Sequence, residues 1–293
     1  MKAFRKRNSQ REFHQKFQLQ SAMEYLMTYG WAILIIAVVL AALFELGVFN
    51  PMTFAPKASP GSCQVVRPDG PGTTDFISLS GECNGELPQY VAQFRSGSTL
   101  ENITINNLPS IAPSAGDNFT IAMWVDPIHT SSFYGVAEAG PGTQIGWSTE
   151  FSPNGIGWLL SNTLAPGGTW TFITAEETVG TSASIYLNGA ITAYTTENTS
   201  IQSAGSYRIG SYFVCCQYEG AISNVQIYNT ALSPNGIKAL YQEGIGGAPI
   251  KIQSLVGWWP LNGNANDYSG NNNNGVPNGV TYTSNWYSGY SAP

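Results

Sequence analysis

The sequence predicts a mainly β protein, an antiparallel β-sandwich preceded by one long apolar α-helix. Short runs in which apolar and polar residues alternate, separated by Gly, Asn and Pro, indicate the strands of an antiparallel sandwich. An uncharged apolar run from Tyr25 to Phe44 indicates the helix. Charged residues make up only 10% of the chain, which also has 32 Gly and 15 Tyr. This composition is typical of secreted β-rich proteins.

The predicted helix, residues 20–47, is long enough to cross a membrane. At about 1.5 Å rise per residue, the uncharged run spans roughly 30 Å, the hydrocarbon thickness of a bilayer. Six of the 12 Lys and Arg residues precede Gln20. The positive-inside rule therefore predicts a cytoplasmic N-terminus and an extracellular C-terminal part at the cell surface. A cleaved secretory signal peptide is disfavoured, because its apolar core would be shorter and followed by a small-residue site.

The predicted external part is acidic. After Gln20 there are 17 acidic residues against six basic ones, a net charge of −11. Proteins that bind nucleic acid neutralise phosphates with Lys and Arg. The charge balance therefore excludes nucleic acid as an expected partner.

The start of the apolar run carries a spaced pair of polar residues. Gln20 opens it, and Glu24 follows in Gln20-Ser21-Ala22-Met23-Glu24. This pattern resembles the class III signal peptides of archaeal type IV pilin-like precursors. The resemblance implies that a prepilin-peptidase-like enzyme removes the basic leader, residues 1–19, between Leu19 and Gln20. It also implies self-assembly through the helix, with Glu24 pairing with the amino terminus of a neighbouring subunit.

Leu19 departs from that family, which usually has Gly or Ala before the cleaved bond. The alternative is an uncleaved N-terminal membrane anchor.

Three motifs follow one another in the external part: Asn118 to Val125, with Phe-Thr-x-x-x-Trp-Val; Ile185 to Gly189, with Tyr-x-Asn-Gly; and Gly220 to Ser233. In this order they resemble the strands of laminin-G-like, concanavalin A-like jelly rolls. The resemblance implies a jelly roll over residues 90–253 and a carbohydrate or cell-surface ligand. A short helix is expected after the third motif, with Ser233 as N-cap and Pro234 as its first residue.

The C-terminal segment, residues 254–293, resembles the opening strand of such a domain, although it comes last in the chain. We expect it to complete the same sandwich as a permuted strand, since the termini of a sandwich often lie close together. Donation to a neighbouring subunit and a truncated second repeat are the alternatives. Residues 48–89 are predicted to be a Pro/Gly-rich linker and a Cys-bounded β segment.

The four cysteines allow three disulfide connectivities. We favour Cys63–Cys83 with Cys215–Cys216, because each pair is local. A loop of about 20 residues closed by the first pair adds on the order of 3 kcal/mol. Crossed pairing, which would tie the two regions together, is the alternative.

Candidate ligand-binding residues are aromatic side chains in or near predicted loops, where a ring can stack on a sugar: Trp147, Trp158, Tyr218 and Trp286. Asp267, among Asn and Ser residues, is the candidate ligand for a Ca²⁺ site, although the same pattern favours an ordinary Asx turn. Sequons for N-glycosylation begin at Asn102, Asn118 and Asn198.

No enzyme is predicted. Glycosidases on related jelly rolls place two carboxylates on one face of a strand, whereas the consecutive Glu176 and Glu177 point to opposite faces. No Gly-x-Ser-x-Gly elbow occurs either. The sequence therefore predicts a pilin-like surface adhesin with a lectin-like sandwich. A structural filament subunit or anchored protein without a ligand is the alternative, and a carbohydrate-active enzyme is a distant one.

Overall fold

The structure is a computed structural model, and it describes the following residues: 27, 29–45, 55–95, 100–106, 108, 117–128, 135–139, 144–146, 150–152, 159–160, 165–178, 181–196, 206–211 and 217–293. They fall into two compact units, Met1–Ala55 and Pro56–Pro293. Each unit is described by itself.

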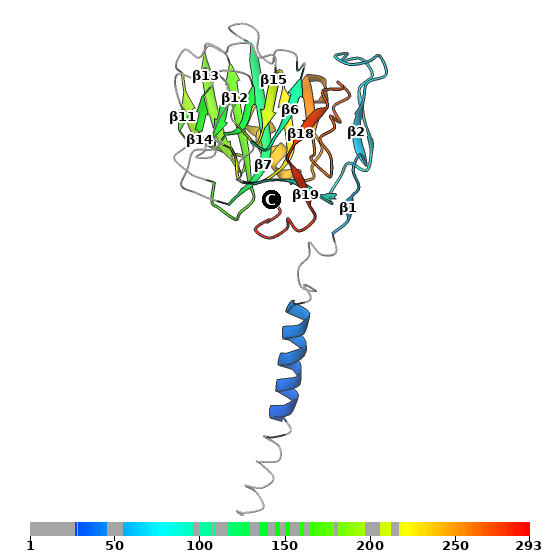
Figure 1. Ribbon diagram of the computed structural model, residues 1–293, viewed down its shortest axis with the longest axis vertical. Coiled ribbons are helices and arrows are strands. Elements are labelled where there is room, and N and C mark those ends of the chain that lie inside the picture. The colour runs from blue at the N-terminus through cyan, green and yellow to red at the C-terminus, as the bar shows by residue number, and fades with distance from the viewer. Residues whose placement is uncertain are drawn as a thin grey trace, which may run out of the picture. The chain divides into compact units, whose positions relative to one another are not determined.

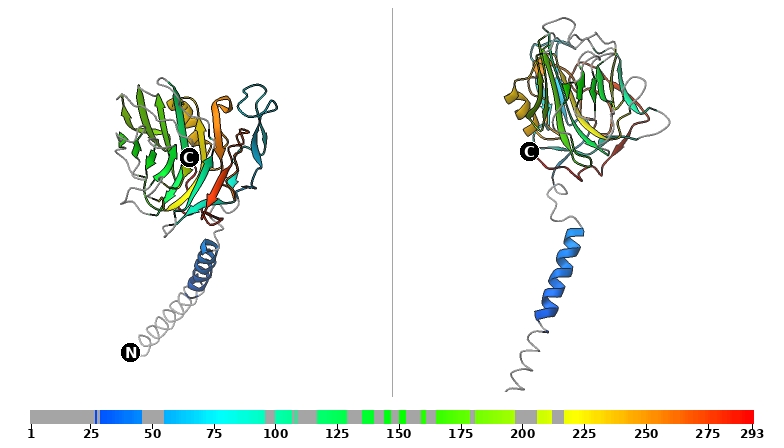
Figure 2. Two further views of the ribbon diagram at one scale, coloured as in Figure 1. Left: turned by 45° about the horizontal axis from the view of Figure 1, so that its top comes forward. Right: turned by 90° about the vertical axis from the view of Figure 1, so that its left-hand side faces the viewer.

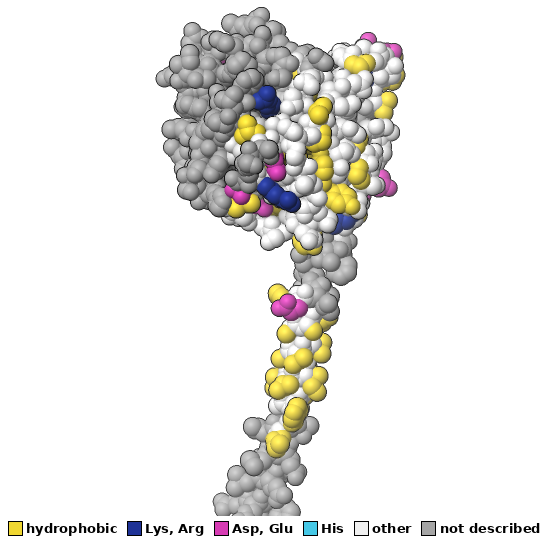
Figure 3. All heavy atoms as spheres, in the orientation of Figure 1, with side chains coloured by type: hydrophobic (Ala, Val, Ile, Leu, Met, Phe, Trp, Pro, Cys, Tyr) yellow, Lys and Arg dark blue, Asp and Glu magenta, His cyan; other side chains and the backbone are white. Residues whose placement is uncertain are grey.

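The N-terminal unit contains a helix over residues 29–45, where the sequence predicts one. Its apolar side chains are exposed along its length, among them Trp31 at 63% and Phe44 at 75% (Figure 3). Within the described ranges, no helix has the length and apolar character required to span a membrane. The membrane-spanning role therefore stays a prediction.

The second unit is a sandwich of two antiparallel sheets (Figure 1). In the part of the chain that is described, the first sheet has seven strands in the order β11 (Leu159–Leu160), β10 (Glu150–Ser152), β9 (Gln144–Gly146), β8 (Gly135–Ala139), β15 (Ser206–Ile209), β6 (Asn102–Asn106) and β18 (Gly275–Asn278). The second has eight, in the order β14 (Ala190–Thr195), β13 (Ser182–Leu187), β12 (Thr171–Thr178), β7 (Asn118–Pro127), β16 (Gly220–Tyr228), β5 (Val91–Phe94) and β19 (Thr281–Thr283), with β17 (Leu255–Trp259) also paired to β16.

The C-terminal segment completes both sheets within the chain. Strand β17 pairs with the second half of β16, whose first half pairs with β5. Strand β19 pairs with β5 in the same sheet, and β18 pairs with β6 in the other. The expected intramolecular completion is thus what the structure shows, and Trp259 of β17 is fully buried between the sheets.

The core between the sheets consists of the side chains on alternate positions of the strands. In β7 these are Phe119, Ile121, Met123 and Val125, all at most 1% exposed. The intervening Trp124 faces outward, where it stacks on Tyr241 with ring centroids 5.7 Å apart. The period-two pattern of the sequence therefore corresponds to a strand whose side chains are packed on both faces.

Helix α3 (Pro234–Gln242) covers the outer face of the larger sheet (Figure 2, right). It begins as predicted, with the Ser233 side chain accepting a hydrogen bond from the Gly236 N–H at 3.2 Å. The expected hairpin between β13 and β14 turns at Asn188 and Gly189, whose φ angles of 49° and 76° suit a type I′ turn. The structure therefore confirms the local signals of two of the three motifs.

From residue 56 on, the segment before β5 packs against the sandwich, so it is not a separate linker. It contains a parallel pair, β1 (Lys57–Ala58) with β4 (Leu87–Pro88), and an antiparallel hairpin, β2 (Cys63–Val66) with β3 (Ser78–Gly81). The hairpin lies beside the C-terminal segment in the different views (Figures 1 and 2). It is joined to that segment by the Val65 N–H, which donates to Tyr268 O at 2.8 Å. Between β16 and β17 runs one turn of 3₁₀ helix, η1 (Ile252–Ser254).

Candidate functional site

Two of the aromatic residues predicted to stack on a ligand are core residues instead. Tyr218 is fully buried, with its hydroxyl donating to Ala221 O at 3.0 Å. Trp286 is 3% exposed, and its Nε1 donates to Pro88 O at 3.1 Å. Trp286 lies near the turn at residues 288–289, but both rings fold inward because each polar atom finds a buried carbonyl. Trp147 and Trp158 lie outside the described residues.

The predicted Ca²⁺ ligand Asp267 has a structural role. Its Oδ1 accepts from the N–H groups of Trp258 (3.0 Å) and Ser269 (2.9 Å). Its Oδ2 accepts from the Ser269 hydroxyl (2.8 Å) and the Asn273 N–H (2.9 Å). These four bonds use the acceptor capacity of a carboxylate and include the bond of an Asx turn, the interpretation that the sequence favoured, whereas the Ca²⁺ site stays a prediction. Among the residues with described side chains, no group of three or more His, Cys, Asp or Glu could hold a metal.

The three sequons differ in their surroundings. Asn102 is only 7% exposed, and its Nδ2, the atom to which a glycan would be attached, donates to Leu100 O at 3.3 Å. The folded chain therefore shields this position, contrary to prediction. Asn118 is half-buried at the start of β7. Asn198 lies outside the described residues, as do Leu19, Gln20 and Glu24.

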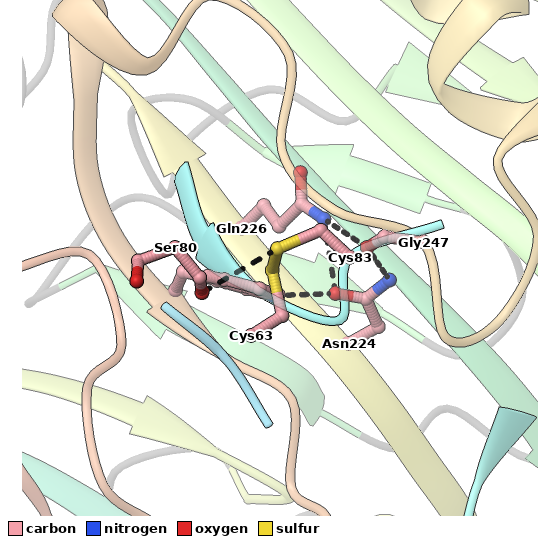
Figure 4. The surroundings of a disulfide bond; sticks show 7 residues. Cys63, Ser80, Cys83, Asn224, Gln226 and Gly247 are labelled. Atoms are coloured by element: carbon pink, nitrogen blue, oxygen red, sulfur yellow. Dashed lines mark hydrogen bonds between the residues drawn. A yellow bond between two sulfur atoms is a disulfide. The ribbon is translucent and has the colours of Figure 1, made fainter. Parts of the chain in front are cut away.

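The disulfide Cys63–Cys83 is present as predicted, with its Cα atoms 5.0 Å apart (Figure 4). It joins the start of β2 to the residues after β3 and so closes the base of the hairpin. The pair Cys215–Cys216 lies outside the described residues.

A buried polar network lies next to this disulfide (Figure 4). The Oδ1 atom of Asn224 accepts from Trp258 Nε1 at 2.8 Å and from Gln226 Nε2 at 2.9 Å. Its Nδ2 donates to Gly247 O at 2.9 Å, and the Tyr228 hydroxyl donates to Gln226 Oε1 at 2.6 Å. The network fixes β16 to β17 and to the chain after α3. The adjoining cavity of about 30 Å³ has room for water but not for a sugar.

A larger cleft lies between the disulfide-closed hairpin and the C-terminal segment. Its volume is about 340 Å³, within the range of ligand sites in proteins. Four carboxamides contribute to its lining, so we call it the amide cleft. Its lining residues are Arg67, Pro71, Gly72, Thr74, Asn229, Gln253, Leu255, Val256, Asn271 and Asn273.

Arg67 holds the two walls of the amide cleft together. It is 9% exposed, and its Nε donates to Ser269 O at 2.8 Å while Nη1 donates to Thr73 O. Its Nη2 donates to Ile252 O at 3.0 Å and to Leu255 O at 3.1 Å. Burial lowers the pKa of the guanidinium, and the charge of Asp267 opposes that shift. The guanidinium therefore acts as a cross-link between backbone carbonyls.

Two of the four carboxamides are fixed by the backbone. Asn271 Nδ2 donates to the carbonyls of Leu255 and Val256, both at 2.9 Å, and its Oδ1 accepts from the Gly72 N–H at 2.9 Å. Asn273 Nδ2 donates to Val256 O at 2.9 Å. No motif in the sequence points to this site, because the backbone carbonyls that hold these side chains have no sequence signature. The one signal that the sequence offered was Arg67, an isolated cation among only six basic residues after Gln20.

Comparison with known families finds a match for part of the sandwich. Residues 98–238 match the model of the concanavalin A-like lectin/glucanases superfamily. This part of the sandwich is similar to the concanavalin A-like jelly rolls. The match begins after β5 and ends before β17, so the amide cleft, whose walls come from segments 67–74, 229 and 253–273, lies mostly outside it.

Solved structures are similar to part of this chain. A candidate carbohydrate-binding protein from Bacteroides ovatus is 15% identical, with 71% of this chain and 67% of that one covered and a TM-score of 0.51. A heptameric SAP-like pentraxin from Limulus polyphemus is 12% identical, with 67% and 94% covered and a TM-score of 0.47. At these identities the likeness is one of fold. No curated protein matches the chain.

Proposed function

We propose that the chain is an archaeal, pilin-like surface adhesin whose jelly roll recognises carbohydrate. The observation that carries the proposal is a jelly roll with an open cleft of about 340 Å³ lined by four carboxamides. Carboxamides donate and accept hydrogen bonds at once, as sugar hydroxyls do. The similarity to a candidate carbohydrate-binding protein supports the fold on which this proposal rests. The proposal includes no catalytic step.

The N-terminal unit supports the anchoring part of the proposal. The helix over residues 29–45 exposes apolar side chains all round, a pattern that needs lipid or protein to cover it. The leader before Gln20 holds half of the basic residues of the chain, and Glu24 keeps the pilin-like spacing. The disulfide Cys63–Cys83 fits an oxidising compartment outside the cytoplasm. Mass spectrometry of the native N-terminus would test processing at Leu19/Gln20.

A glycan array tests the recognition part. The full chain, held in a zwitterionic detergent without a sugar headgroup, is applied with Ca²⁺ and with a chelator. Binding to a defined set of glycans is expected. Uniform absence of binding in both conditions would contradict the proposal, and binding only with Ca²⁺ would assign a cation to recognition.

A structural filament subunit without a ligand is the second candidate. The exposed apolar side chains of residues 29–45 favour it, because helices of this kind can pack against one another in a filament core. Electron microscopy of native cell surfaces, with an antibody against residues 56–293, distinguishes filaments from scattered molecules. Filaments that bind no glycan would favour this candidate over the first.

A further inference from the structure

We infer that the amide cleft binds an uncharged sugar residue, with Asn229 and Gln253 as its adjustable contacts. The inference rests on the proposed function and adds to it a site and a ligand class. The site differs from Tyr218 and Trp286, which lie in the core, and from Asp267, which lies in a turn.

The first argument is that the cleft is built in advance. Asn271, Asn273 and Arg67 are held by backbone partners on both walls, as described above, so a ligand need not order them on binding. Binding sites that are already ordered lose less conformational entropy when the ligand arrives. A volume of about 340 Å³ leaves room for a sugar ring with some bound water.

The second argument concerns charge. The lining of the cleft includes no carboxylate, and its one cation, Arg67, is bonded to four backbone carbonyls and lies near the charge of Asp267. The chain after Gln20 has a net charge of −11, which repels acidic ligands at long range. A neutral ligand therefore fits the cleft better than a uronic or sialic acid.

The third argument is that two polar groups are available for binding. The side chains of Asn229 and Gln253 are exposed, and within the described structure neither makes a hydrogen bond. They come from different elements, since Asn229 follows β16 and Gln253 lies in η1. Thr74 adds a hydroxyl from the hairpin, and the exposed Pro71 gives apolar surface for the C–H face of a sugar. This combination is typical of carbohydrate sites, where few polar groups set the orientation over apolar contacts.

The experiment compares two double variants of the full chain. Asn229→Ala/Gln253→Ala removes the two available carboxamides of the cleft. Asn235→Ala/Gln242→Ala removes two exposed carboxamides of α3 and is the matched control. Both are titrated, beside the wild type, with the neutral oligosaccharide bound most strongly on the array, and with a sialylated or uronic-acid relative of it. Thermal unfolding verifies that each variant is folded.

The expected result is about tenfold weaker binding of the neutral glycan by the cleft variant, with the control within about twofold of the wild type. A third variant, Thr74→Trp, fills the cleft from an exposed position and is expected to abolish binding. Unchanged binding by both cleft variants would overturn the inference while leaving carbohydrate recognition in place. Preference for the acidic glycan would overturn the ligand class, and absence of any glycan binding by the wild type would overturn the proposed function itself.

Discussion

The β2–β3 hairpin (residues 63–81) meets residues 252–274 along a contact that we call the seam. Different forces hold this seam and the core between the two sheets. The core is apolar and closed, with Trp259, Phe119 and Ile121 at most 1% exposed. The seam is polar, with Arg67 and Asn271 donating to backbone carbonyls across it. Apolar packing leaves no room for a ligand, whereas the hydrogen-bonded seam leaves the amide cleft open.

The largest effect is expected in the core. Trp259→Ala removes a fully buried ring that stacks on Tyr207 and donates to Asn273 O at 2.9 Å. We expect a loss of about 3–5 kcal/mol in the free energy of unfolding, measured by urea denaturation. The control Tyr194→Ala, at a residue 58% exposed on β14, should change it by less than about 1 kcal/mol. Equal losses in the two variants would show that β17 is not part of the core.

The next effect concerns the hairpin wall of the seam. Cys63→Ser/Cys83→Ser opens a loop of 20 residues, which the chain-entropy model values at about 3 kcal/mol. We expect urea denaturation to show a loss of this size in the free energy of unfolding. We also expect a weaker affinity for glycan, because the hairpin forms one side of the cleft. Ser78→Ala, on the exposed strand β3, is the control. Wild-type glycan affinity in the double variant would show that the cleft does not depend on the disulfide.

Arg67 tests the seam directly. Arg67→Ala removes four hydrogen bonds to backbone carbonyls, and we expect about 2 kcal/mol less stability together with loss of glycan binding. Arg67→Lys keeps the charge with fewer donors and should give an intermediate result. The exposed Arg95→Ala is the control for loss of a cation. If Arg67→Ala matched Arg95→Ala, the seam would not depend on this cross-link.

The smallest effect depends on pH and concerns the outer face of the larger sheet. Burial raises the pKa of Asp126 on β7 to about 6, so the folded state holds its proton more tightly than the unfolded chain. The free energy of unfolding should therefore rise as pH falls from about 7 to about 4. Solvent screening of this partly exposed group limits the gain to about 1 kcal/mol.

Urea denaturation at both pH values measures this gain in the wild type and in Asp126→Asn, which should lack it. Asp69→Asn, on the exposed hairpin loop, should keep it. A gain of the same size in Asp126→Asn would assign the pH dependence to other groups.

The difference between core and seam also explains what could be predicted from the sequence. The alternating pattern predicted β7, β13 and β16, and Asn188-Gly189 predicted the hairpin turn between β13 and β14, because periodicity and turn chemistry are local properties. The C-terminal strand was predicted from its likeness to an opening strand, and its expected place in the sheet is the one observed.

The seam could not be predicted in this way. The carbonyl partners of Arg67 lie up to 202 residues away, and a backbone carbonyl has no signature in the sequence. Asp267 combines the features of a turn and of a cation site in the sequence, and the turn became visible only through its four hydrogen bonds. Trp286 lies beside a turn, which predicts exposure, but its burial depends on Pro88 from the other wall.

Hydrogen–deuterium exchange on the full chain, with and without the best neutral glycan, tests most directly the claim that the seam holds the binding site. The account predicts slower exchange on both walls of the amide cleft, residues 70–74 and 252–256, and little change in α3. Protection confined to other loops of the jelly roll, with no change in these two segments, would contradict it.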